Sequence, residues 1–322
     1  MKPFAYARPK AVSEAVDLVR GGATVMAGGT DLLGLMKDGI AAPERVVDIR
    51  DLEPLRGWTR TKGKGLRIGA LVPLVELETS TDLATLMPIV AEALRPAATA
   101  QLRTMGTVGG NLLQRNRCWY FRDEAYPCWL KGGVRCFAVD GDNRLHAIVG
   151  AEECVAVAPS DLAPALIAYD ATVAVSGARG SRSMPLCDLF VVPHGRVRRE
   201  HAIAADELIT EIRVPENAMA RRGAFEKAME RKSWSFALVS VAASVKVIGG
   251  VARDARIVLG GVAPVPWRAR EAEKLLEGQV LDDAACAAAA DAALDKAEPL
   301  KDNGYKVPLA RELVRRTLRR LA

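Results

Sequence analysis

Two glycine-rich turns constrain the fold of this chain more than any other feature. The first, "AGGTD" at residues 27–31, follows a short apolar strand-like stretch and precedes a helix-like segment ending at Gly39. Glycine permits positive φ, so consecutive N–H groups can face one concave side, and a following helix adds its positive N-terminal dipole. Thr30 can donate a hydroxyl hydrogen bond, and Asp31 is placed to cap the helix. The turn is a candidate phosphate-sized anion site, and an ordinary strand-to-helix turn is the alternative.

A second glycine cluster, "TMGTVGGN", spans residues 104–111. It is predicted to lie where a helix runs into a loop, with Gly106, Gly109 and Gly110 again freeing the backbone. Thr107 and Asn111 supply polar side chains. Neither cluster matches G-x-G-x-x-G or a P-loop, which argues against a Rossmann nucleotide site and an ATPase.

The rest of the chain mixes strands and helices in two blocks. A helix is predicted over residues 12–20, strands at 45–49, 66–71 and 155–158, and a helix and a strand after the "PSD" turn at 159–161. Beyond residue 222 we expect antiparallel strands interrupted by a helix, and from Arg268 a helical, alanine-rich tail. The pattern predicts an α+β chain with a domain boundary near Pro215.

Charge and hydropathy exclude several protein classes. Lys and Arg exceed Asp and Glu by six, and the one dense basic run, "RELVRRTLRR" at 311–320, is interpreted as a solvated, partner-facing helix rather than a nucleic-acid footprint. No stretch reaches the about 18 apolar residues of a membrane span, and the start lacks an export signal. The sequence therefore predicts a cytoplasmic protein.

Four of the six cysteines fall within residues 111–161, together with six aromatic residues. Cys118, Cys128, Cys136 and Cys154 are separated by nine, seven and seventeen residues. A chain this long does not need a disulfide scaffold, so metal ligands are favoured. Zinc usually takes close C-x2-4-C pairs, which are absent, whereas an iron–sulfur cluster accepts widely spaced thiolates. Four unligated thiols are the remaining alternative; the lone Cys187 and Cys286 are interpreted as inert.

The segments "AGGTDLL", "LRTMGTVGGN" and "PSD", in this order, resemble the FAD-binding subunit of the molybdenum hydroxylases, the family of xanthine dehydrogenase, carbon monoxide dehydrogenase and aldehyde oxidoreductase. The resemblance continues through "FEKAMERKSWSFALVSVAASV" and "IVLGGVAPVPWRAREAE". It implies an FAD-binding fold of the PCMH or vanillyl-alcohol-oxidase type, with two α+β subdomains enclosing FAD. The implied limits are 1–215 for this domain, with an iron–sulfur insertion at 112–158, and 216–322 for an α+β C-terminal domain.

The resemblance also implies site residues. It assigns the FAD diphosphate to the backbone of Ala27, Gly28, Gly29, Thr30, Asp31 and Leu32, and other parts of FAD to Thr107, Gly110, Asn111, Ser160, Asp161 and Ile209. Lys227 matches the family lysine near the flavin ring, where its charge would favour the anionic reduced form. By residue type alone it would be a solvated lysine. No catalytic residue is implied beyond the flavin.

Between Asn111 and Asp161 the chain is much longer than in the family's commonest form, with 50 positions from one to the other. A long loop inside a compact domain needs something to organise it. Two family branches carry an insertion with a 4Fe-4S cluster at this point: 4-hydroxybenzoyl-CoA reductase and the bacterial periplasmic aldehyde oxidoreductase. "NLLQRNRC" and "HAIVG" resemble the second branch more. His146 lies in the insertion as an ordinary loop histidine or as a hydrogen-bond donor near the cluster.

The resemblance implies an electron-transfer subunit of a heterotrimer. A molybdenum-cofactor large subunit would oxidise aldehydes, and electrons would pass through the 2Fe-2S clusters of a small subunit to FAD and an external acceptor. Two alternatives stay open: the reversed electron flow of 4-hydroxybenzoyl-CoA reductase, and a stand-alone FAD reductase. A non-redox module with a structural zinc is a further alternative. Export of the assembled complex by a signal on a partner would make it periplasmic.

Overall fold

A small parallel sheet near the N-terminus carries the first glycine turn. The computed structural model describes residues 1–322. The sheet has the order β1 (Ala5–Ala7), β3 (Arg45–Asp48), β2 (Thr24–Met26), and both pairings are parallel. The amphipathic helix α1 (Val12–Arg20) buries Ala15, Val16 and Val19 in one apolar cluster with Val47 of β3. The turn leads from β2 into α2 (Leu32–Lys37), which confirms the predicted helix at 12–20 and the strand–turn–helix order.

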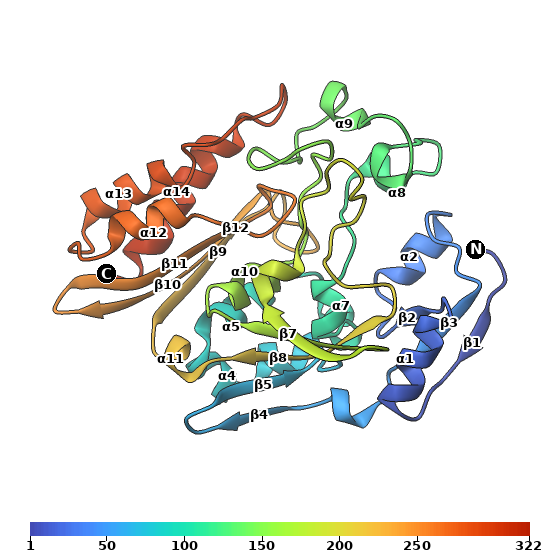
Figure 1. Cartoon of the computed structure of the whole chain (residues 1–322). Coiled ribbons are helices and arrows are strands. Elements are labelled where there is room, and N and C mark those ends of the chain that lie inside the picture. The colour runs from blue at the N-terminus through green and yellow to red at the C-terminus, as the bar shows by residue number, and fades with distance from the viewer.

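A five-stranded antiparallel sheet forms the base of the molecule (Figure 1). Its order is β4 (Trp58–Thr61), β5 (Gly65–Gly69), β8 (Glu207–Val214), β6 (Thr172–Gly177), β7 (Gly180–Pro185). Helices packed with this sheet into one core are α3 (Leu74–Thr79), α4 (Thr81–Leu86), α5 (Pro88–Leu94), α7 (Val108–Leu112) and α10 (Leu162–Ile167). The helix α6 (Ala100–Met105) has no buried residue and lies against α3. In β6 the buried Val173 and Val175 alternate with less buried neighbours, the period of a strand with one face in the core.

The insertion folds with little regular structure. It contains α8 (Trp119–Arg122), a 3-10 turn (Trp129–Lys131) and α9 (Phe137–Asp140), and it spans from α2 to the C-terminal helices (Figure 1). Phe121, Trp129 and Leu130 form a small core with Leu35 of α2. The strand predicted over 155–158 is wrong. This segment has no sheet partner, and the Ala158 N–H donates instead to the Ala263 carbonyl, 3.0 Å away.

The C-terminal part is a four-stranded antiparallel sheet with helices on one face. The strand order is β12 (Trp267–Arg268), β11 (Val251–Gly260), β10 (Val239–Ile248), β9 (Arg222–Ala228), after the short α11 (Glu216–Met219). The covering helices are α12 (Arg270–Leu276), α13 (Asp283–Ala292) and α14 (Lys306–Arg319). Because Val241 and Ala243 pack toward these helices while Ala242 belongs to the core of the first part, β10 is buried on both faces. Burial of both faces explains why β10 is a long run of mostly apolar residues.

The helix expected between these strands is also wrong. Residues 229–238, between β9 and β10, form an irregular loop. Trp234 has φ of +51°, outside the helical region, and its side chain lines a cavity instead of packing on the sheet. The predicted antiparallel strands and helical tail are confirmed.

The basic run at 311–320 lies on α14, and its arginines are paired within the chain. The partners are Asp291 for Arg311, Glu312 for Arg315, Glu226 for Arg316, Asp283 for Arg319 and Glu92 for Arg320. These charges belong to the ion pairs of the fold itself, which agrees with a solvated helix. None of the helices is long and apolar enough to cross a membrane.

Asp170 ties the C-terminal sheet to the first part of the chain. Its carboxylate accepts hydrogen bonds from Arg221 at 2.7 Å and from Arg256 at 2.8 Å. The Arg221 side chain is only 1% exposed, and its next acidic neighbour, Asp254, is 3.8 Å away. Asp170 therefore carries most of the charge compensation for a buried guanidinium.

We expect Asp170→Asn to lower the free energy of unfolding by about 3 kcal/mol, because it leaves a buried charge without its partner. Asparagine tolerates the positive φ of +52° at this position, so the backbone is kept. Urea denaturation measures the change. The control is Asp17→Asn, which removes an exposed pair with Arg20 and should change stability by less than about 1 kcal/mol. Equal effects of the two substitutions would contradict this role of Asp170.

Candidate cofactor-binding site

The two glycine segments lie directly against each other. A Cβ atom on Gly28 would lie 1.7 Å from the carbonyl oxygen of Met105, which only glycine avoids. Gly29 has φ of +71°, in the left-handed region that glycine adopts without strain. On the other side, a Cβ on Gly106 would lie 3.7 Å from the Thr30 hydroxyl. Two motifs far apart in the sequence therefore lie in contact, and we call this contact the meeting point.

The second glycine segment is a helix rather than the predicted loop. Gly109 and Gly110 lie within α7, whose N-cap Thr107 accepts a hydrogen bond from the Gly110 N–H at 3.2 Å. A Cβ on Gly109 would lie 3.1 Å from the Cβ of Ala70. Gly109 is needed for close packing beside the end of β5, and neither glycine has a positive φ.

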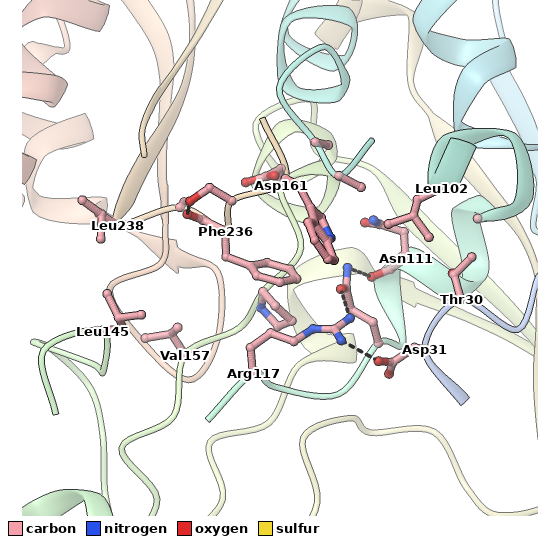
Figure 2. Close-up of a pocket in the computed structure, with 18 of the residues that line it drawn as sticks. Thr30, Asp31, Leu102, Asn111, Arg117, Leu145, Val157, Asp161, Phe236 and Leu238 are labelled. Atoms are coloured by element: carbon pink, nitrogen blue, oxygen red, sulfur yellow. Dashed lines mark hydrogen bonds and ion pairs between the residues drawn. The ribbon is translucent and has the colours of Figure 1, made fainter. Parts of the chain in front are cut away.

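A cavity of about 800 Å³ opens beside the meeting point; we call it the cofactor cavity. Figure 2 shows Thr30 and Asp31 of the first turn, Asn111 of α7, Asp161 of the "PSD" turn and Phe236 of the loop 229–238 around the same space. All three parts of the chain contribute to its wall. A volume in the upper range of ligand pockets suits a molecule of dinucleotide size.

Two polar contacts hold the inner wall. The Ser160 hydroxyl donates to Asn111 Oδ1 at 2.6 Å and accepts from the Ala163 N–H at 3.0 Å, which joins the "PSD" turn to α7. The Lys227 ammonium lies 2.7 Å from Asp161 Oδ2, and both side chains are buried. Burial raises the pKa of the Asp161 carboxyl, and the neighbouring Lys227 charge offsets part of this shift.

Asp31 does not cap α2 with its side chain as predicted. Its carboxylate instead pairs with Arg117 at 2.9 Å and Arg122 at 2.8 Å, and it accepts from the Arg115 N–H. Charge-assisted bonds to the insertion are stronger than a cap to a neutral N–H, so they decide where the carboxylate lies. The Arg117 guanidinium also lies 4.9 Å from the Phe236 ring centre, and burial lowers its pKa.

The predicted site residues divide into two groups. Thr30, Asp31, Gly110, Asn111 and Asp161 line the cofactor cavity. The others lie outside its lining: Ala27, Gly28, Gly29, Leu32, Thr107, Ser160 and Lys227 are in the turns and strands that support it, and Ile209 lies in β8 within the core.

Sequence reasoning missed a second set of lining residues. Arg117, Trp119, Trp234 and Phe236 come from the insertion and from the loop 229–238. The available signal was the cluster of aromatic and basic residues in "ERKSWSF", directly after Lys227.

The four cysteines of the insertion line one small, mostly apolar cavity, the thiol cavity. Cys118, Cys128, Cys136 and Cys154 share it with aromatic residues that include Phe121 and Trp129. None of the four is in a disulfide, and no three His, Cys, Asp or Glu side chains are grouped so as to hold a single metal ion. Cys187 and Cys286 lie elsewhere in the fold.

The thiol cavity adjoins the cofactor cavity. Cys118 and Ala156 line both. Burial raises the pKa of the Cys118 thiol to about 12, with smaller contributions from Cys136 and Cys128, and burial also raises the pKa of Cys154. Without a metal such thiols stay protonated and inert. His146 lies beside them, and burial, with the nearby Lys306 charge, lowers its pKa to about 4.

Comparison with known proteins agrees with this geometry. The sequence profile of the FAD binding domain in molybdopterin dehydrogenase matches residues 2–217, and that of the CO dehydrogenase flavoprotein C-terminal domain matches residues 224–321. The chain is 37% identical over 317 residues to the aldehyde oxidoreductase FAD-binding subunit PaoB of Escherichia coli, covering 97% of this chain and 96% of that one.

The carbon monoxide dehydrogenase medium chain of Hydrogenophaga pseudoflava is 30% identical, with 98% and 96% of the two chains covered. A solved structure of carbon monoxide dehydrogenase from this organism, which lacks the Mo-pyranopterin moiety, superposes with a TM-score of 0.79 at 29% identity, covering 100% of this chain and 98% of that one. These matches confirm the resemblance and the fold class deduced from the glycine segments.

We expect Lys227→Met to destabilise the protein increasingly as the pH rises. Without the ammonium group Asp161 is a buried carboxyl with no opposite charge, so its folded-state pKa rises further above its unfolded value. Such a group contributes stability that is present at low pH and is lost as the pH rises through the folded pKa. The loss of unfolding free energy relative to wild type, measured with urea, should grow between about pH 5 and about pH 8.

The double variant Lys227→Met/Asp161→Asn is the matched control. It removes both titratable groups, so the steep loss of stability that the single variant shows as the pH rises should be absent. A loss of unfolding free energy in the single variant that does not vary with pH would contradict the buried pair of Asp161 and Lys227.

Proposed function

The chain belongs to the FAD-binding subunits of the molybdenum hydroxylases. From this premise we propose that it is the electron-transfer subunit of a heterotrimeric aldehyde-oxidising enzyme, and that it contains FAD and a 4Fe-4S cluster. Its partners are a molybdenum-cofactor large subunit and a 2Fe-2S small subunit. It receives electrons released at the molybdenum subunit and delivers them to an external acceptor. The higher identity to the Escherichia coli aldehyde oxidoreductase subunit than to the carbon monoxide dehydrogenase chain supports aldehydes as substrates.

The cofactor cavity is the observation that carries the proposal. The turn at residues 27–32 offers backbone N–H groups to the FAD diphosphate, and Thr107, Gly110 and Asn111 hold the adjoining region. When bound, FAD supplies a ring that accepts electrons singly and releases them in pairs. Asp161 lines the cavity, whereas Lys227 lies behind it, so Lys227 would act on a bound flavin ring through the carboxylate with which it pairs.

The proposed domain limits follow the two sheets. β8, the central strand of the first sheet, ends at Val214, and β9 of the second sheet begins at Arg222. We therefore propose an FAD-binding domain at 1–215, with the insertion at 112–158, and a C-terminal domain at 216–322. The loop 229–238 of the second domain closes the cavity of the first.

The grouping of four thiols around the thiol cavity supports the proposed 4Fe-4S cluster. Four thiols face one space, and each becomes a suitable ligand once metal binding deprotonates it. Besides the four cysteines, most of the lining residues are hydrophobic, and these would supply the dry shell that such a cluster requires. Cys118, Cys128, Cys136 and Cys154 would be its ligands. Their wide spacing in sequence favours a cluster over a zinc ion.

Gly28→Ala tests FAD binding and the direction of electron flow together. The added methyl group clashes with the Met105 backbone, so FAD affinity should fall about tenfold or more. In the purified complex, aldehyde should still reduce the partner subunits, but transfer to a dye acceptor should be lost in proportion to the missing FAD.

Gly34→Ala in α2 is the matched control, because a Cβ there meets nothing within 4 Å, and it should keep both FAD and activity. Full FAD content and activity in Gly28→Ala would overturn the assigned site. Turnover by the chain without partners would instead identify a stand-alone FAD reductase, and reduction of 4-hydroxybenzoyl-CoA by the complex would identify the reversed flow.

Cys128→Ser tests the cluster. Loss of one of four thiolates should remove the iron and acid-labile sulfide of the 4Fe-4S cluster from the anaerobically purified complex, while the partner's 2Fe-2S clusters and the FAD content are kept. Cys286→Ser, which replaces an equally buried thiol outside the thiol cavity, should leave both unchanged. Unchanged iron of the 4Fe-4S type in Cys128→Ser would contradict the assignment.

A further inference from the structure

His146 lines the cofactor cavity and contacts Cys118, which lines both cavities. Its Nε2 is 3.2 Å from the Cys118 sulfur, and both residues line the cofactor cavity. The histidine is 2% exposed, and its ring meets the edge of the Trp119 ring with centres 5.2 Å apart. Among the chain's three histidines, His194 and His201 lie outside the insertion.

The backbone of His146 is held by the C-terminal domain. Its carbonyl accepts from the Lys306 ammonium at 2.9 Å and from the Asn303 amide at 3.3 Å, and its N–H donates to the Asn143 carbonyl at 2.9 Å. Lys306 is fully buried and also donates to the Gly261 carbonyl. These bonds fix the backbone of residue 146 from both sides, and the contact with the Trp119 ring packs the imidazole beside Cys118.

The contact with Cys118 determines which ring nitrogen of His146 carries the hydrogen. A ligating thiolate only accepts hydrogen bonds, so Nε2 must carry the proton in this contact. The other nitrogen, Nδ1, is buried and has no hydrogen-bond partner within the chain. The contact between Nε2 and the Cys118 sulfur is therefore the one polar contact that the His146 ring makes within the chain.

We propose that His146 is a positioning residue that donates an Nε2–H hydrogen bond to the Cys118 sulfur and thereby raises the reduction potential of the 4Fe-4S cluster. This inference rests on the proposed function, because it needs the cluster. Reduction adds negative charge to the sulfurs, and an N–H donor stabilises that charge more in the reduced state than in the oxidised state. Cys118 is the only one of the four ligands that lines both cavities, so the bond acts on the ligand next to the cofactor cavity.

The test compares His146→Phe and His146→Gln in the purified complex, with the cluster potential measured by EPR-monitored redox titration. Phenylalanine fills the space without a donor, so the potential should shift to a more negative value while iron and FAD contents stay those of wild type. Glutamine places an N–H near the position of Nε2, so its potential should lie close to that of wild type. An unchanged potential in His146→Phe, or an equal shift in both variants, would overturn the inference.

A second measurement needs no substitution. In wild-type complex labelled with 15N-histidine, the reduced cluster should show a 15N coupling by pulsed EPR, and its absence would overturn the inference even if His146→Phe fails to assemble. The iron content of wild type separates the two proposals. A complex without cluster iron would overturn the cluster itself, whereas a cluster with no histidine coupling would overturn the role of His146 alone.

Discussion

The close approach of Gly28 to the Met105 carbonyl is the contact on which the cofactor cavity depends. It joins the turn after β2 of the small parallel sheet to the end of α6, directly before α7 of the larger core. With any side chain at position 28 the two segments would have to separate, because the obstacle is backbone and cannot rotate away. The wall formed by Thr30 and Asn111 exists because this contact is short.

Buried ion pairs then join the three parts of the chain around the cavity. Asp31 of the first turn is held by Arg117 and Arg122 of the insertion, and Asp161 is held by Lys227 of the C-terminal sheet. A buried carboxylate needs an opposite charge and hydrogen bonds, so each pair specifies one relative placement of the elements that carry it. Asp170 does the same on the side away from the cavity, through Arg221 and Arg256.

The insertion shows why local patterns failed in some places. The apolar stretch at 155–158 has the composition of a strand, but no neighbouring strand pairs with it. Only single backbone bonds hold it, from the Ala158 N–H to the Ala263 carbonyl and from the Ala147 N–H to the Val155 carbonyl. The loop 229–238 likewise follows the needs of the cavity, with Trp234 and Phe236 in its wall. The backbone hydrogen-bond partners of both segments lie outside the segments themselves, so a pattern of neighbouring residues cannot predict them.

The sequence by itself determined the family, the α+β class, the helix at 12–20, the antiparallel strands after residue 222 and the membership of both glycine segments in one site. The class, the helix and the strands follow from hydrophobic period, which is a property of neighbouring residues. The family and the shared site follow from the resemblance of the motifs. Only the tertiary structure decided that Asp31 pairs with arginines instead of capping α2, that Gly109 is needed for packing on Ala70, and that His146 contacts Cys118, which lines both cavities. Each of these is a contact between segments far apart in the chain, and its energy depends on burial and charge that arise only once the chain has folded.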